Sequence, residues 1–337
     1  MQRVYVTGAA GFIGFHLCEL LLAEGFRVHG HDGMTAYYDP ALKRARLSIL
    51  QGREGFGFTE AMLEDHAGLA ADMGRFRPDV VVHLAAQAGV RYSLEAPRSY
   101  LSSNIEGTFN VMEAARDLGV KHLLLASTSS VYGANTAMPY RETDKADAQV
   151  SLYAATKKAT EALSHSWAHL WGLPVTCFRF FTVYGPWGRP DMAPFKFTRA
   201  VLAGEPIDVY GHGEMFRDFT YVTDLVRAIR LLIDRAPERP AAPGDVEEGD
   251  SLSPVAPWRV VNIGNGEKVA LGDFIAAIEQ AAGRTAIRNL MEMQKGDVVA
   301  TWADNRLLTR LTGYRPQTGI VTGMEAFVAW YRDHYGV

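Results

Sequence analysis

A glycine-rich turn at residues 7–14, TGAAGFIG, constrains the fold most, because a short β-rich run precedes it and helical apolar spacing follows it. Gly8 allows a tight turn, Gly11 lets the backbone approach a pyrophosphate, and Gly14 lets the helix pack closely on the strand. The start of that helix adds free N–H groups and a positive dipole end. The residues expected to contact such a ligand are Gly8, Gly11, Phe12, Ile13 and Gly14. On its own, the pattern fits a structural turn as well as a dinucleotide site.

An acid at the end of the next predicted strand favours the dinucleotide site. Asp32 ends the run 26–32 and lies 18 residues beyond Gly14, where a carboxylate can accept both hydrogen bonds of an adenosine ribose. The same carboxylate would repel a 2′-phosphate, so the loop and the acid together predict NAD rather than NADP. A solvated strand end is the remaining alternative for Asp32.

The order of apolar segments predicts a Rossmann-type doubly wound parallel α/β sheet. Strands are expected at 4–6, 26–32, 79–84, 121–126 and 174–180, and helices at 12–24, 104–118 and 152–171. After Thr182 the pattern is irregular and richer in Gly and Pro, which indicates a smaller mixed α/β substrate domain. We expect an NAD-binding domain at 1–182, rejoined by about 218–236 and 258–272, and a second domain from 183–217 and 273–337. The Pro-rich acidic segment 236–257 is expected to be a surface loop.

Composition excludes several classes of protein. The 337 residues carry a net charge of −4, so no broad basic field for nucleic acid is expected. No signal peptide or apolar run of membrane-spanning length is found, and we expect a soluble cytoplasmic protein. Cys18 and Cys177 lie in apolar segments and are expected to be buried thiols. The ten histidines lack metal-ligand spacing; His29 and His31 share a strand face, but no third ligand is expected nearby.

Tyr153 and Lys157 form an i, i+4 pair at the start of the long predicted helix. A phenol with a pKa near 10 is a poor base at neutral pH, so it needs help. A neighbouring ammonium and a cationic nicotinamide would both stabilise the phenolate, and Lys157 can also hold the nicotinamide ribose. Such a pair is usually an ordinary helix face, but after a dinucleotide signal the functional interpretation is favoured.

These motifs resemble the extended short-chain dehydrogenase/reductase family of sugar-nucleotide enzymes. The matching stretches are TGAAGFIG, HLAAQAGVRYS, SNIEGTFNVMEAAR, STSSVYG, YAATK, RFFTVYGPWGRPDMA, RDFTYV and NIGNG. The resemblance implies that Tyr153 is the catalytic base and acid, that Lys157 is its partner, and that Thr128 bonds the reacting sugar oxygen. It also implies that Ala86 and Gln87 line the cofactor cleft, and that a homodimer forms through the 104–118 and 151–171 helices.

The run Thr128-Ser129-Ser130 separates the members of that family. The 4,6-dehydratases that resemble this stretch read Thr-Asp-Glu there, and the UDP-glucuronate decarboxylases typically read Thr-Ser-Glu. This chain lacks both acids. What remains for Tyr153 is to let hydride return to the other face of C4, which is epimerisation without net redox change or cofactor release.

The same hydroxyls suggest an acidic sugar, because several O–H donors can bind a carboxylate without a buried cation. Thr182 stands where UDP-glucose 4-epimerases usually have Asn, and the stretches 37–46 and 188–197 look like UDP-glucuronate 4-epimerases. We therefore expect interconversion of UDP-glucuronate and UDP-galacturonate. A neutral UDP-hexose 4-epimerase is the nearest alternative. A non-catalytic NAD-sensing protein is another, although such proteins commonly lose the Tyr or the Lys.

The resemblance assigns several further residues. Arg217 in RDF is expected to fork onto the nucleotide diphosphate. Arg189 is expected to contact substrate or a dimer loop, and Asp297 in QKGDV to hold the uridine end. Ala61 and Met62 align where the family has an acid and an apolar residue, so Met62 should face the adenine while an acidic contact to its amino group is missing.

Overall fold

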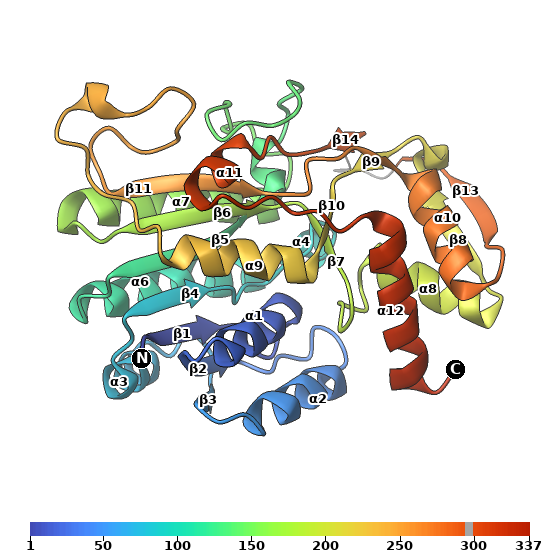
Figure 1. The fold of residues 1–337 in the computed structure, drawn as a ribbon, viewed down its shortest axis with the longest axis horizontal. Helices are drawn as coiled ribbons and strands as arrows, with labels where there is room; N and C mark the ends of the chain where they lie inside the picture. Colours follow the sequence, from blue (N-terminus) through green and yellow to red (C-terminus); the bar gives the residue numbers. More distant parts are fainter. Residues whose placement is uncertain (294–298) are drawn as a thin grey trace.

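The computed structural model describes residues 1–293 and 299–337, and its main feature is a seven-stranded parallel sheet (Figure 1). Its strands, in the order β11-β6-β5-β4-β1-β2-β3, are hydrogen-bonded in parallel throughout. They are β1 (Arg3–Thr7), β2 (Arg27–Asp32), β3 (Phe56–Glu60), β4 (Val80–His83), β5 (His122–Thr128), β6 (Val175–Phe180) and β11 (Trp258–Ile263). The predicted doubly wound α/β fold is confirmed.

Helices cover both faces of this sheet, because its strands carry apolar side chains on both sides. Val80 and Val82 of β4 pack into one core with α1 and α9, whereas Val81 packs into another with α3 and α6. Figure 1 shows α1 and α9 side by side in front of the sheet. The helices of the two layers are α1 (Phe12–Ala23), α9 (Val222–Ile233) and α11 (Arg306–Thr312) on one face, and α3 (His66–Phe76), α6 (Gly107–Asp117) and α7 (Leu152–Trp171) on the other. Helix α2 (Pro40–Gln51) packs beside α1 and β3.

A second, smaller group of elements forms its own apolar core at one side of the sheet. Phe219 and Phe274 stack with ring centroids 4.4 Å apart in this core, and Phe195 packs edge-on against Phe327. The main elements are α8 (Ala193–Ala203), β8 (Pro206–Tyr210), α10 (Leu271–Ala282), β13 (Ile287–Met291) and α12 (Ile320–Tyr335). Short strands connect them to the large sheet: β7 (Thr182–Tyr184) pairs with β10 (Phe219–Tyr221), and β9 (Phe216–Arg217) pairs with β12 (Val269–Ala270) and β14 (Ala300–Thr301).

The remaining elements are short. The helix predicted at 104–118 is confirmed for the most part as α6, which a π-helical turn, η1 (Leu101–Glu106), precedes. The other short helices are α4 (Tyr92–Glu95), α5 (Pro97–Tyr100), η2 (Ser129–Tyr132), η3 (Gly211–Gly213) and η4 (Pro243–Asp245). Segment 236–257 contains only η4 and is mostly exposed, as predicted. None of the helices in the described part of the chain has the length and apolar character that crossing a membrane requires.

Candidate active site

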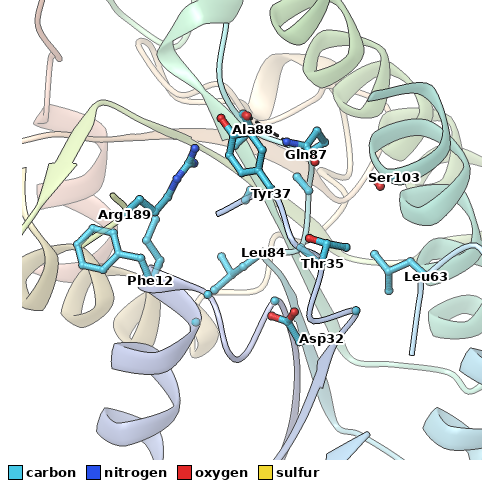
Figure 2. A pocket seen from close by; sticks show the side chains of 18 of the residues that line it. Phe12, Asp32, Thr35, Tyr37, Leu63, Leu84, Gln87, Ala88, Ser103 and Arg189 are labelled. Carbon is cyan, nitrogen blue, oxygen red and sulfur yellow. Dashed lines mark hydrogen bonds between the residues drawn. The ribbon is translucent and has the colours of Figure 1, made fainter. Parts of the chain in front are cut away.

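A cavity of about 240 Å³ opens at the carboxyl edge of the sheet, where the strand order reverses between β1 and β4 (Figure 2). Ligands of doubly wound sheets bind at this switch point, because the loops on its two sides diverge. All the residues predicted to contact the cofactor lie on the cavity wall: Gly8, Gly11, Phe12, Ile13, Gly14, Asp32, Met62, Ala86, Gln87, Tyr153 and Lys157. Motifs that are far apart in the sequence therefore meet in one place.

The glycine turn is shaped as the sequence requires. Gly8 has a φ of +72°, and its N–H donates to the carbonyl of His31 at 2.7 Å. A Cβ at Gly14 would lie 2.0 Å from the Gly8 carbonyl oxygen, so α1 packs on the turn at a distance that only glycine permits. Gly11 precedes α1 and gives it no side-chain cap. The first N–H groups of α1 are therefore left for an anionic ligand.

Asp32 is buried and held in place by backbone groups. Its Oδ2 accepts from the Ala10 N–H at 3.1 Å, and its Oδ1 accepts from the Met34 N–H at 2.8 Å. Only 6% of the residue is exposed, so the alternative of a solvated strand end is wrong. Lys43 Nζ lies 3.7 Å from Oδ1 and also lines the cavity. The sequence interpretation missed Lys43, although the 37–46 stretch that contains it had been singled out.

Tyr153 and Lys157 face the cavity from the first two turns of α7, which Ser151 caps by accepting from the Ala154 N–H at 3.2 Å. Lys157 Nζ donates to the Ala126 carbonyl at 2.9 Å, which fixes the ammonium beside the end of β5. Burial lowers the pKa of Lys157 to about 8.

The pKa of Tyr153 is governed mainly by burial of the phenol. Burial raises it above its usual value, and a hydrogen bond with Thr128 and the charge of Arg189 only partly oppose that effect. The expectation that Lys157 and a cationic nicotinamide together lower this pKa concerns the protein with NAD bound, and it stays a prediction.

The hydroxyl run lies where β5 ends. Thr128 Oγ1 accepts from the Ser130 N–H at 3.2 Å and donates to Ser130 Oγ at 3.2 Å, so this strand end partly satisfies its own polar groups. Thr128 pairs in register with Phe180, and Thr182 follows two residues later. Thr128, Ser129, Ser130 and Thr182 are not on the wall of the 240 Å³ cavity, although their neighbours Ser127 and Phe180 are.

A buried ion pair joins the elements that carry these groups. Arg179 of β6 donates through Nε and Nη2 to the two carboxylate oxygens of Glu161 on α7, at 2.9 and 2.8 Å, and both side chains are at most 3% exposed. Ser127 Oγ donates to the same carboxylate at 2.6 Å. Burial would raise the pKa of Glu161, but the charge and hydrogen bonds of Arg179, the charge of Lys158 and the Ser127 hydrogen bond together hold the pKa below its usual value. The pair therefore remains ionised and ties β5, β6 and α7 together.

Of the three remaining residues predicted to contact the substrate, only Arg189 lies on the cavity wall among the described residues. Arg189 lines the cavity and pairs with Asp191, with Nε–Oδ1 3.0 Å and Nη2–Oδ2 2.6 Å. Arg217 lies in β9, away from the cavity wall, and donates to the Phe216 and Val299 carbonyls. Asp297 lies outside the described residues.

The cavity wall that holds Met62 also carries an acid two residues further along the chain. Glu64 lines the cavity and accepts from Ser103 Oγ at 3.0 Å, while the expectation that the adenine amino group lacks an acidic contact stays a prediction. The sequence interpretation looked for an acid only at positions 61 and 62. Other missed lining residues come from the β2–α2 segment and from neighbouring strand ends, and include Thr35, Tyr37, Tyr38, Leu63, Ser127 and Phe180.

The two histidines of β2 do have an acidic neighbour, contrary to expectation. Asp72 Oδ2 lies 3.1 Å from His29 Nε2 and 3.8 Å from His31 Nδ1, and it accepts from the Tyr5 hydroxyl at 2.7 Å. Burial lowers the pKa of both histidines. Within residues 1–293 and 299–337, no group of three or more His, Cys, Asp or Glu side chains is arranged to hold a metal ion.

The glycine turn, the buried acid of β2 and the Tyr–Lys pair in one cavity define an NAD-binding enzyme of the short-chain dehydrogenase/reductase type. The chain belongs to the NAD dependent epimerase/dehydratase family, whose model matches residues 4–245. The family resemblance of the sequence motifs is thereby confirmed.

Relatives and solved structures cover nearly the whole chain. A probable UDP-glucuronate 4-epimerase from Rhizobium meliloti (strain 1021) is 51% identical over 334 residues, which are 99% of this chain and 98% of the relative. A UDP-glucuronic acid 4-epimerase from Bacillus cereus, solved with UDP-glucuronic acid and NAD, has a TM-score of 0.86 at 31% identity and matches 99% of this chain and 100% of that one. A UDP-glucose 4-epimerase from Thermotoga maritima, solved with UDP-glucose, has a TM-score of 0.85 at 28% identity, again over 99% and 100%.

Replacement of Gly14 by alanine tests the cofactor site. The added methyl group would collide with the Gly8 carbonyl, so the turn must shift, at a cost of about 1–3 kcal/mol. We expect Gly14→Ala to lose most of the NAD that co-purifies with the wild-type protein, as measured by absorbance and mass spectrometry of the heat-released dinucleotide. Gly74→Ala is the control, because Gly74 lies within α3 with open space at its Cβ. Equal NAD content in the two variants would contradict the assignment of the turn.

Proposed function

We propose that the protein is a UDP-glucuronate 4-epimerase, an isomerase that interconverts UDP-glucuronate and UDP-galacturonate through a transient 4-keto sugar while NAD stays bound. The observation that carries the proposal is the run Thr128-Ser129-Ser130 beside an intact Tyr153–Lys157 pair. Hydroxyl residues stand where the dehydratases and decarboxylases of this family have acids. The names of the Rhizobium meliloti relative and the Bacillus cereus structure support the same substrate.

We assign the cofactor to residues 1–182, with 218–236 and 258–272, and the UDP-sugar to 183–217 and 273–337. Tyr153 takes the proton of the C4 hydroxyl and later returns it, and Thr128 bonds the same sugar oxygen. Bound NAD supplies the hydride acceptor for C4 and the donor for the opposite face. Lys157, held by the Ala126 carbonyl, is placed to bond the nicotinamide ribose. The proposed substrate contacts are Thr128, Ser129, Ser130, Tyr153, Thr182, Arg189, Arg217 and Asp297.

The carboxylate must be held in a fixed orientation. Once C4 is oxidised, the sugar is a β-keto acid, which loses CO₂ when the C5–C6 bond aligns with the carbonyl π system. Hydroxyl donors from Ser129, Ser130 and Thr182 can keep the carboxylate out of that alignment while it remains solvated by O–H groups. An apolar pocket would instead favour loss of the charge as CO₂.

A neutral UDP-hexose 4-epimerase is the nearest alternative. The fold does not separate the two substrates, because the Thermotoga maritima UDP-glucose 4-epimerase has nearly the same TM-score as the Bacillus cereus enzyme. The hydroxyl run and Thr182 favour the acidic sugar. A non-catalytic NAD-sensing protein is disfavoured because Tyr153 and Lys157 both face the cavity.

We further propose a cytoplasmic homodimer that pairs through the η1–α6 segment and α7. Leu101, near the start of α7, and Leu170 and Trp171, at its end, are 52%, 64% and 48% exposed, which supports contact with a second copy at both ends of the helix. Cys18 and Cys177 are buried free thiols, as a reducing compartment permits.

Comparison of two substrates tests the proposed function. The donors that match a carboxylate are left poorly satisfied by a hydroxymethyl group, so we expect kcat/KM for UDP-glucuronate to exceed that for UDP-glucose by about 10²-fold or more. Steady-state assays with the separated products measure both values. Equal values, or a preference for UDP-glucose, would assign the protein to the neutral hexose epimerases.

Removal of single hydroxyls tests the restraint on CO₂ loss. Ser129→Ala, Ser130→Ala and Thr182→Val should epimerise more slowly and release more UDP-4-keto-pentose, leaving NADH on the enzyme. A hydrogen bond to a charge contributes about 1.5–3 kcal/mol, so the partition between the products should change about tenfold or more. NADH absorbance and mass spectrometry follow the change, with Ser48→Ala on the exposed face of α2 as the control. Slower epimerisation with no additional pentose or NADH would limit these hydroxyls to binding.

A further inference from the structure

Tyr37 lines the NAD cavity and contacts two loops from other parts of the chain. It belongs to the segment between β2 and α2, and its hydroxyl donates to Asp191 Oδ2 at 3.1 Å. Its ring lies 4.7 Å from the Tyr92 ring, centroid to centroid, and the Arg189 guanidinium lies 5.6 Å from its centroid. A Cβ at Gly89 would lie 2.9 Å from the Tyr37 hydroxyl, so the β4–α4 loop approaches the ring closely. Figure 2 shows Tyr37 between Arg189 and the Gln87–Ala88 segment.

A second anchor joins α2, which follows the Tyr37 segment, to the loop that carries Arg189. Arg46 of α2 is fully buried, and its guanidinium donates to the Trp187 carbonyl at 2.6 Å and to the Gly188 carbonyl at 3.4 Å. It also donates to the carbonyl of Ala10 in the glycine turn at 3.0 Å. The loop that carries Arg189 is therefore fixed at its beginning by Arg46, whereas near its end it is held through the Tyr37–Asp191 hydrogen bond.

These two anchors differ in how easily they open. The Arg46 contacts are enclosed, and breaking them would leave a buried charge without its acceptors, which is strongly unfavourable. The Tyr37 hydroxyl, by contrast, is held by hydrogen bonds to the Asp191 and Arg189 side chains of one loop, and its ring is only partly buried. Opening of the cavity should therefore begin at Tyr37, with Arg46 as the fixed end.

We propose that Tyr37 is a positioning residue that retains NAD: through Asp191 it holds the Arg189 loop closed over the cavity during turnover. The inference rests on the proposed function, in which hydride is stored on the cofactor while the keto sugar presents its other face. A cofactor that left at that moment would carry the hydride away and strand an oxidised sugar. Slow release of the dinucleotide is therefore part of what an epimerase requires.

Exchange of the bound cofactor tests this role independently of turnover. Purified holoenzyme is incubated with isotopically labelled NAD, and mass spectrometry of the bound dinucleotide gives the exchange rate. Tyr37→Phe keeps the ring contacts with Tyr92 and Arg189 and removes only the hydroxyl, so exchange should be about tenfold faster, as expected for one lost hydrogen bond to a carboxylate. The midpoint of thermal unfolding of the variant, measured at the same NAD concentration, should fall by no more than the weaker NAD binding accounts for.

Two further variants show whether the effect is specific. Tyr314→Phe removes a similar bond, 2.8 Å from the tyrosine hydroxyl to Asp224 Oδ1, that lies off the cavity wall. It should exchange NAD at the wild-type rate. Asp191→Ala should accelerate exchange, and adding Tyr37→Phe to it should bring no further acceleration, because coupled residues are not additive.

The outcomes separate this inference from the proposed function. Wild-type exchange in Tyr37→Phe, equal acceleration in Tyr314→Phe, or additive effects of Tyr37→Phe and Asp191→Ala would each overturn the role of Tyr37, while leaving epimerisation intact. Slow wild-type exchange that Tyr37→Phe accelerates, in a protein that does not epimerise UDP-glucuronate, would support the role of Tyr37 and overturn the proposed function.

Discussion

The buried ion pair between Glu161 and Arg179 is the interaction on which the arrangement of the site depends. Removing one partner of such a pair leaves an uncompensated charge and costs about 3–5 kcal/mol, so the three elements it joins are held together firmly. Glu161 lies one turn after Lys157 on α7, Arg179 lies three residues before Thr182, and Ser127 directly precedes Thr128. One contact between two residues that lie off the cavity wall thus positions both the Tyr153–Lys157 pair and the hydroxyls.

Donors without charge suit the acidic substrate of the proposed reaction. A buried cation would bind a carboxylate strongly, but it would also stay costly to bury when the sugar is absent. Hydroxyls can bond one another instead, as Thr128 and Ser130 do here. The strand end is therefore stable before substrate binds, and its O–H groups can turn toward a carboxylate afterwards.

The cofactor part of the site follows from sequence because parallel strands bring their carboxyl ends to one edge. The turn after β1, the acid that ends β2 and the Tyr–Lys pair of α7 each have a local signature, and the topology brings them together. The helices and strand between residues 33 and 78 were not predicted from the sequence. One reason is that β3 is a half-exposed edge strand without a continuous apolar run. Helix α2 is rich in charged residues, and its buried Arg46 looks like a surface residue in sequence.

Contacts between distant segments were beyond sequence reasoning. Tyr37 and Asp191 are 154 positions apart, and nothing local indicates their hydrogen bond. For Arg217, the local motif suggests a role at the diphosphate. Its placement in β9 depends on pairing with the distant strands β12 and β14, which the motif does not indicate. The pKa of Tyr153 likewise depends on how deeply α7 packs, which a helical spacing does not reveal.

The central claim is that one hydride leaves C4 and returns to the same carbon without leaving the protein. The most direct test uses UDP-glucuronate carrying deuterium at C4, incubated with the purified protein and no added NAD, followed by mass spectrometry and NMR of the products. The account predicts UDP-galacturonate that retains deuterium at C4. UDP-galacturonate with protium at C4, or no conversion at all, would contradict it.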